Sequence, residues 1–236
     1  MDLRAIEKRI TSAIQLEKRP VAITFAAEPP AGGKRYEAMA PSGCTFWKLA
    51  AEGQTFYTEQ AHHYNCAVGC YTHSIALPPE RAHELPDTVN LMASIGYIKP
   101  EEVSGIPHLA QAPGVVVYSP LGDAAATPDV VLLVGRPGRL MLLQEAAIRA
   151  GVGAGASMLG RPTCASLPAA MTQGAVVSSA CVGNRVYTDL GDDELYIAIP
   201  GKDIERVANE LDTIVTANQK LTAYHNERKS ALTSRS

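Results

Sequence analysis

Two apolar runs near the middle of the chain constrain the fold more than any other feature. The segments "GVVVYSPLG" (114–122) and "PDVVLLVGRP" (128–137) are apolar at consecutive positions, not at alternate ones. Strands with that pattern are covered on both faces of a sheet. The sequence therefore predicts an α/β (or α+β) fold with helices packed on the sheet. A dimer face would bury such runs equally well, so a homodimer stays open.

Further strands and helices surround these two runs. The N-terminal helix and the C-terminal helix each carry an apolar stripe, at Leu3, Ile6, Ile10 and Ile14 and at Ile204, Val207, Leu211, Ile214 and Val215. Shorter β-rich segments predict strands at 20–26, 55–59, 175–179 and 194–200. Helical patches are expected at 88–95 and 100–104, and the glycine-rich stretch 151–160 is expected to form a loop. The polar tail, residues 222–236, is expected to fray.

Composition excludes several classes of protein. With 236 residues and 46% hydrophobic content, the chain is long enough for one domain spanning 1–236. A net charge of −3 provides no basic field, so neither nucleic acid nor an anionic membrane is expected as a partner. The N-terminus lacks the apolar stretch of a signal peptide, and no run reaches the roughly 18 apolar residues of a membrane span. We expect a cytoplasmic protein.

The order of elements repeats within the chain. In the first half, a strand precedes Cys44, a short helix ends at a glycine, and a second strand precedes Cys66. In the second half, the same order runs through Cys164 and Cys181, with an additional helix after the first strand. Such self-similarity is a sign of internal duplication.

The repeat predicts two pseudo-repeated strand–helix–strand halves, at about 10–110 and 114–215, around one mixed sheet. The match is imperfect, because twelve residues separate the glycine from the second cysteine in one half and six in the other. If the halves are related by a pseudo-twofold axis, the four cysteines would approach one another at that axis.

The cysteines are the residues that point to chemistry. Five cysteines without dense spacing are more typical of ligands, nucleophiles or buried thiols than of disulfides in a reducing compartment. Cys44 and Cys164 lie where short helices should begin, which favours lowered thiol pKa values. Four thiolates can hold a [4Fe–4S] cluster or a zinc ion, and the wide sequence separation of Cys44, Cys66, Cys164 and Cys181 favours the cluster. Gly69 and Gly183, just after two of the cysteines, would let the backbone turn around it.

Other residues near the cysteines are candidates for substrate contact. Arg161 and Arg185 lie close in sequence to the later cysteines, and His62 and Tyr64 precede Cys66. The two adjacent histidines are expected to be exposed on a loop.

Cys70 lies outside the set of four expected ligands. It would be an alternative ligand, a nucleophile facing the substrate, or a buried thiol. A dithiol pair with Cys66 is a weaker alternative, because redox motifs generally use the spacing C-x-x-C.

The motifs "CTFWKLAAEG", "CAVG", "GRPTC", "ACVGNR" and "ELYIAIP" together resemble a prokaryotic domain-of-unknown-function family, number 169, from about Ile10 to about Val215. The resemblance implies a cysteine-containing family without a settled activity. The positions that match the family's pattern are Cys44, Cys66, Cys164, Cys181, Gly69, Gly183 and Arg185. Cys70 departs from that pattern.

Three functions remain open from the sequence. The first is an iron–sulfur protein that transfers electrons to a redox partner, or that binds or transforms a small molecule as a reductase or lyase. The second is a zinc-binding or redox-sensing module without catalysis. The third is a metal-free thiol enzyme.

Overall fold

The computed structural model describes residues 1–153 and 157–233, and its centre is a seven-stranded sheet with the strand order β2-β3-β1-β4-β7-β6-β5. All neighbouring strands are antiparallel except the parallel pair β5–β6. The strands are β1 (Val21–Ala26), β2 (Phe56–Glu59), β3 (Val115–Pro120), β4 (Val130–Gly135), β5 (Ser157–Leu159), β6 (Val176–Ser178) and β7 (Leu195–Pro200). The predicted mixed α/β architecture is confirmed.

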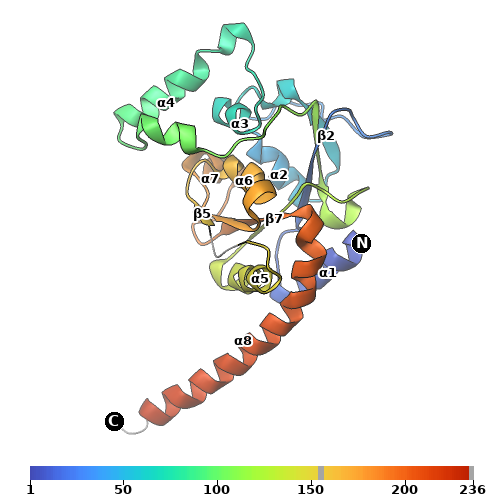
Figure 1. The fold of residues 1–236 in the computed structure, drawn as a ribbon, viewed down its shortest axis with the longest axis vertical. Helices are drawn as coiled ribbons and strands as arrows, with labels where there is room; N and C mark the ends of the chain where they lie inside the picture. Colours follow the sequence, from blue (N-terminus) through green and yellow to red (C-terminus); the bar gives the residue numbers. More distant parts are fainter. Residues whose placement is uncertain (154–156, 234–236) are drawn as a thin grey trace.

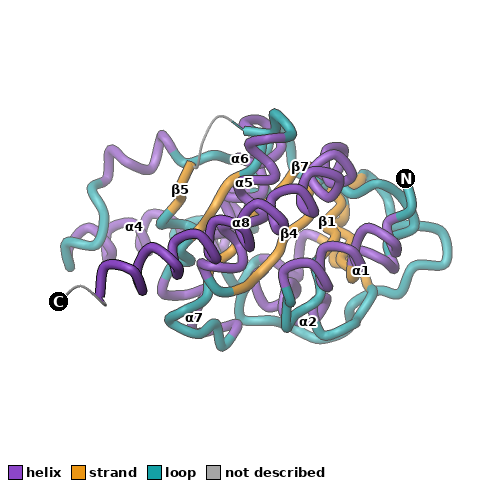
Figure 2. Tube along the Cα trace, turned by 90° about the horizontal axis from the view of Figure 1, so that it is seen from below, coloured by secondary structure: helices purple, strands orange, loops and turns teal. Residues whose placement is uncertain are grey.

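Three helices cover one face of the sheet. They are α1 (Leu3–Ile14), α5 (Pro137–Arg149) and α8 (Ile204–Thr233), and Figure 2 shows them side by side in front of the strands. Their apolar stripes form one buried cluster with the sheet, in which Ile10, Leu143 and Leu211 have no exposed surface. The two terminal stripes identified in the sequence therefore pack as predicted.

Helix α8 departs from the sequence expectation. It continues to Thr233 and projects beyond the body of the molecule, so the prediction that the chain frays after Leu221 is wrong for the described part of the tail (Figure 1). The part of α8 from residue 222 onward is polar on every face, so it is not buried. It contains many good helix formers, however, and these continue a helix whose first turns are already formed on the sheet.

Four shorter helices cover the opposite face. They are α2 (Cys44–Ala51), α3 (Ala67–Thr72), α6 (Ser166–Gln173) and α7 (Val182–Thr188). Helices α2 and α6 bury Phe46, Trp47 and Leu167 against the strands, in a second cluster that also contains Cys44 and Cys164. The N-termini of these two helices thus deliver two thiols into the interior.

A segment that we call the arm, residues 79–106, extends from the body beside α3 (Figure 1). It contains α4 (Glu84–Ser94) between the 3₁₀ turns η2 (Pro79–Arg81) and η3 (Pro100–Gly105), and none of its residues is buried. The helical patches expected at 88–95 and 100–104 are both present, the first beginning earlier, at Glu84.

The glycine-rich stretch 151–160 contains strand β5, whereas the sequence predicted only a loop; residues 154–156 lie outside the described residues. Among the helices of the described ranges, none is long and apolar enough to cross a membrane.

Candidate functional site

Four thiols from different elements line one cavity of about 400 Å³ on the sheet face covered by α2 and α6. Cys44 is the first residue of α2, and Cys66 is the N-cap of α3. Cys164 lies in the turn η5 (Thr163–Ala165) that leads into α6, and Cys181 is the N-cap of α7. The four cysteines singled out in the sequence therefore lie around a common space, while their role as ligands stays a prediction.

A hydrogen bond ties two of the thiol-bearing segments together. The backbone N–H of Cys181 donates to the hydroxyl oxygen of Thr163, at 2.6 Å between nitrogen and oxygen. Because Thr163 directly precedes Cys164, this bond holds the two cysteines of the second half in one local frame.

Burial dominates the electrostatics of the thiols. Cys44 and Cys164 are only 7% and 6% exposed, and desolvation raises the pKa of both, with a further contribution from neighbouring cysteines. Desolvation also raises the pKa of Cys66. The prediction of lowered pKa values is wrong for Cys44 and Cys164, since loss of solvent outweighs the helix N-terminus. In the absence of a ligand they are neutral thiols.

Gly69 has a steric role beside Cys66. Its backbone N–H donates to the Cys66 sulfur at 3.3 Å, and a Cβ atom at this position would lie 3.3 Å from the same sulfur. At Gly183 a Cβ atom would meet only the Tyr187 ring, at an ordinary 3.6 Å. The turn after Cys66 is therefore tighter than the turn after Cys181.

Two polar side chains on the cavity lining were not identified from the sequence. Asn184 is 1% exposed, and neither its amide nitrogen nor its amide oxygen has a hydrogen-bond partner. The amide lies close enough to Cys44 to oppose the rise in that thiol's pKa, although it is not in hydrogen-bonding geometry. The hydroxyl of Ser42 is also buried without a partner. Their positions, three residues after Cys181 and two before Cys44, are the only signal the sequence offered.

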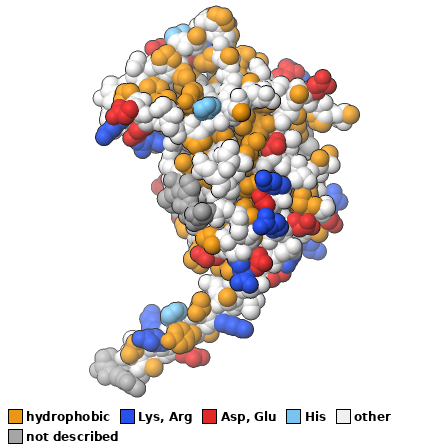
Figure 3. Space-filling view, viewed as in Figure 1, with side chains coloured by type: hydrophobic (Ala, Val, Ile, Leu, Met, Phe, Trp, Pro, Cys, Tyr) orange, Lys and Arg blue, Asp and Glu red, His pale blue; other side chains and the backbone are white. Residues whose placement is uncertain are grey.

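The arm forms the apolar wall of the cavity. Leu85, Val89 and Met92 recur at the spacing of one helix face and line it from α4, and Ile98 and Val103 continue the wall. Figure 3 shows apolar side chains gathered over this part of the surface. The sequence did not predict this wall, because a half-buried helix among scattered prolines carries a weak apolar period.

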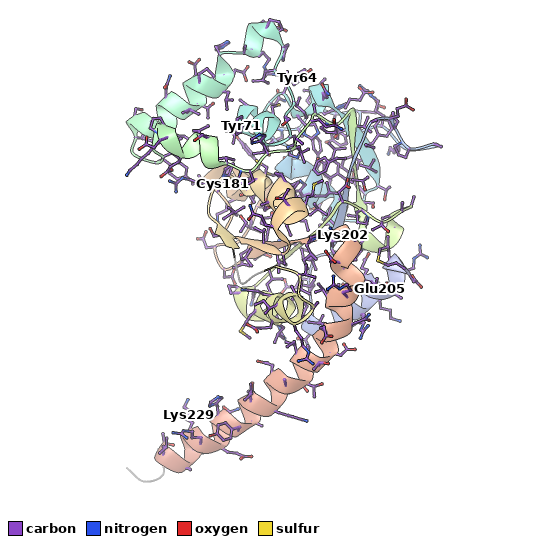
Figure 4. The ribbon with its side chains drawn as sticks, viewed as in Figure 1. Tyr64, Tyr71, Cys181, Lys202, Glu205 and Lys229 are labelled. Atoms are coloured by element: carbon purple, nitrogen blue, oxygen red, sulfur yellow. The ribbon has the colours of Figure 1, made fainter. Side chains whose placement is uncertain are left out.

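Polar contacts hold the arm against the body beside the cavity. The Tyr71 hydroxyl donates to the backbone carbonyl of Val103 at 3.2 Å, and Figure 4 shows Tyr71 and Cys181 on the side of the body that faces the arm. Arg161 lines the cavity, donates to the Glu102 carboxylate at 3.0 Å and lies 4.9 Å from the centre of the Tyr97 ring.

The remaining predicted site residues lie away from the cavity lining. Cys70 is 1% exposed and donates to the backbone carbonyl of His63 at 3.2 Å, and burial raises its pKa to about 12. The Arg185 guanidinium donates to the backbone carbonyls of Ser179 and Gly191, both at 2.6 Å. These contacts are those of residues that stabilise loops.

The two adjacent histidines are buried, so the prediction that they are exposed is wrong. The His62 ring accepts a hydrogen bond from the backbone N–H of Glu59 at 3.0 Å, and its other nitrogen lies 2.9 Å from the Tyr36 carbonyl. His63 lies 2.8 Å from the Thr58 hydroxyl. Tyr64, which follows them, is half-buried and outside the cavity lining.

No group of three or more His, Cys, Asp or Glu side chains in residues 1–153 and 157–233 is arranged as the ligands of one metal ion. The cysteines surround a space and do not pack into a compact ligand set.

Comparison with known proteins gives one family. Neither the curated proteins nor the solved structures gave a match. The model of the family DUF169, described as "Uncharacterised ArCR", matches residues 9–210, and this range includes all four thiols of the cavity and the arm. The chain therefore belongs to the DUF169 family.

Proposed function

We propose that Cys44, Cys66, Cys164 and Cys181 hold a [4Fe–4S] cluster, and that the protein uses it to transfer electrons or to bind or transform a small molecule. The observation that carries the proposal is that four thiols from four separate elements line one cavity. Thiolates are the soft ligands that iron–sulfur clusters require.

The arrangement of the thiols favours a cluster over a single zinc ion. Zinc–thiolate bonds of about 2.3 Å draw four sulfurs into a small tetrahedron. A cluster keeps its thiolates farther apart, since iron and sulfide atoms fill the space between them, and here the thiols surround a cavity. The N–H that Gly69 directs at the Cys66 sulfur is a contact of the kind that stabilises a ligating thiolate.

The raised pKa values of Cys44, Cys66 and Cys164 disfavour these three thiols as the nucleophile of a metal-free thiol enzyme. A nucleophilic cysteine must be a thiolate, and burial keeps these sulfurs protonated. Metal ligation displaces the proton, so the same thiols are suited to ligation.

The register of the sheet supports an approximate twofold relation between the two halves. Strand β1 pairs with β3 from Val21↔Pro120 to Ala26↔Val115, and β4 pairs with β7 from Val130↔Pro200 to Gly135↔Leu195. The two antiparallel pairs thus coincide residue for residue when β1 is matched with β4 and β3 with β7.

The central pair obeys the same correspondence. Between β1 and β4 the pairs are Val21↔Leu132, Ala22↔Val131 and Ile23↔Val130, so exchanging the two strands reproduces the register, with Ala22 and Val131 at the axis.

The outer strands β2 and β6 follow the same correspondence, which then also relates the cysteines of the two halves. Phe56↔Tyr118 between β2 and β3 corresponds to Val176↔Ala198 between β6 and β7. Cys44 and Cys164 each lie twelve residues before the corresponding outer-strand residue. We infer that each half contributes two thiols to a site near the axis.

A bound cluster would supply electron transfer or, at an open iron, Lewis acidity. The chain's own residues would position a bound molecule and limit the access of water. Asn184 and Ser42 offer hydrogen bonds beside the thiols, and the arm excludes water from their apolar side.

The test is anaerobic purification of the full chain, followed by its visible absorption spectrum and by iron, sulfide and zinc analysis. We expect broad charge-transfer absorption with about four iron and four sulfide per chain. Alanine at Cys44, Cys66, Cys164 or Cys181 should reduce both, whereas Cys70→Ala, which removes a thiol as buried as those of Cys44 and Cys164, should retain them. One zinc per chain, or a colourless chain without metal, would refute the cluster.

A further inference from the structure

The four thiols line one part of the cavity, and residues of the arm line another part. The apolar wall of the cavity is the face of α4 that carries Leu85, Val89 and Met92. Ile98 and Val103 of the arm continue this wall. A volume of about 400 Å³ is within the range of small-molecule sites. An apolar wall alone defines no ligand, so the polar atoms on the lining decide its chemistry.

Those polar atoms make no hydrogen bond of normal geometry within the protein, although the Cys44 thiol lies near both side chains and the Tyr196 hydroxyl lies near Asn184. The Asn184 amide is 1% exposed and Ser42 is 2% exposed, and the Asn184 nitrogen and oxygen and the Ser42 hydroxyl make no hydrogen bond. Leaving a buried donor or acceptor unsatisfied is costly, so native structures rarely keep such groups without a ligand or water. The primary amide presents one donor group and one acceptor together, which matches a group that both accepts and donates.

The charges on the lining are already neutralised. Arg161 and Glu102 are the ionised side chains that reach the cavity, and they pair with each other at 3.0 Å. The Arg161 guanidinium also lies over the Tyr97 ring. The pair is half-exposed and contributes little energy, so it is the apolar wall that disfavours a charged ligand, whose charge would lose its hydration there without gaining a partner.

We propose that the cavity binds an uncharged small organic molecule, with a hydrogen-bonding head (a primary amide or an alcohol) at Asn184 and Ser42 and an apolar body beneath the arm. The proposal rests on the proposed function, because it names the class of small molecule that the site beside the thiols would accept. It assigns the arm a function, as the wall that selects the apolar body.

The test uses three probes of one shape: 3-phenylpropanamide, 3-phenylpropanoate and propylbenzene. Binding to the full chain is measured under anaerobic conditions by saturation-transfer NMR and by isothermal titration calorimetry. We expect the amide to bind at least about tenfold more tightly than the carboxylate, since the carboxylate meets no free cation. Propylbenzene should bind about tenfold more weakly than the amide, since it leaves Asn184 unpaired.

Two substitutions on α4 form a matched pair. Met92 lines the cavity, whereas its neighbour Leu91 is 61% exposed and lies outside the lining. Met92→Trp should fill the apolar space and weaken amide binding at least about tenfold, and Leu91→Trp should leave it unchanged. Asn184→Leu should remove the preference for the amide over propylbenzene. Because no residue of α4 is buried, the two tryptophan variants keep the test valid even if Asn184→Leu does not fold.

Three results would overturn the proposal: no binding of the amide at millimolar concentration, tighter binding of the carboxylate, or equal weakening by Met92→Trp and Leu91→Trp. The titrations are run on the metal-free chain and again after incubation with iron and sulfide. If the chain takes up no cluster but binds the amide with the expected pattern, the cluster proposal fails and the ligand proposal stands. If a cluster forms but the amide does not bind, the reverse holds.

Discussion

Gly69 lies so close to the Cys66 sulfur that only a hydrogen atom fits in the place of a side chain. Gly69→Ala would place a Cβ atom 3.3 Å from the Cys66 sulfur, a tight contact that displaces the thiol or its N–H donor. We expect Gly69→Ala to lower the iron and sulfide content after reconstitution by at least about half, because ligand geometry at a cluster tolerates little displacement.

Gly183→Ala is the control for this change. Its added methyl group would meet the Tyr187 ring at 3.6 Å, an ordinary contact, so the cluster content should remain that of the wild type. Equal loss in both variants would show that helix propensity, and not the approach to Cys66, decides the effect.

Buried histidines make the stability of the protein sensitive to pH. Desolvation lowers the pKa of His63 well below its usual range, with His73 adding to the shift, and desolvation likewise lowers the pKa of His73. Both rings are neutral in the folded state, whereas the unfolded chain takes up protons below about pH 6.5. The free energy of unfolding should therefore be constant with respect to these groups above that pH and decrease as the pH falls below it, by up to about 1.4 kcal/mol per pH unit for each ring.

Urea unfolding of the metal-free chain between pH 7.5 and 5.5 measures this slope. Replacing one ring, in His73→Gln, should reduce the slope whatever its effect on absolute stability. The control, His108→Asn, removes an exposed histidine and should leave the slope unchanged. A slope that is the same in all three proteins would contradict the assignment.

Among the elements, the turn after β7 depends on one glycine. An added Cβ at Gly201 would overlap the carbonyl oxygen of Pro128, and the Gly201 N–H donates to the Asp129 carbonyl at 2.9 Å. Gly201→Ala should push β7 away from the start of β4, lowering the free energy of unfolding by about 2 kcal/mol or more. Gly105→Ala in the arm, where the Cβ would meet nothing within 4 Å, should change it by less than about 0.5 kcal/mol in the same urea titration. Similar losses in the two variants would be evidence against the close approach.

The positions of the strands along the chain could be predicted from the sequence, but their order in the sheet could not. The runs at 114–122 and 128–137 became β3 and β4, but β1 lies between them, because hydrophobic pattern reports burial and not pairing. The arm was seen only as helical patches, since its apolar face is half-buried and its function as a wall depends on the cavity opposite. The sequence predicted lowered thiol pKa values, whereas the pKa values are raised. The sequence locates a helix N-terminus but does not show how deeply that N-terminus is buried.

At the scale of the whole molecule, the proposed cluster site would join two halves that share one sheet. Cys44 and Cys66 come from the part of the chain before β4, and Cys164 and Cys181 from the part after it. A ligand bound to all four sulfurs only in the folded state stabilises that state by mass action, and unfolding of either half must release it. Reconstituted protein should therefore melt at least about 5 °C above the metal-free chain, a difference that removal of the cluster with a chelator should abolish.

Hydrogen exchange can assign that stabilisation to one half or to both. Since each half would contribute two ligands, reconstitution should slow amide exchange in α2 and α3 and also in η5, α6 and α7. The projecting end of α8, which lies far from these helices, should exchange at the same rate (Figure 1). Cys70→Ala should preserve this pattern, because its sulfur faces the His63 carbonyl and not the cavity. Protection limited to the segments of one half would mean that only one pair of cysteines binds the metal, and the site would then have to be completed by something other than the opposite half of this chain.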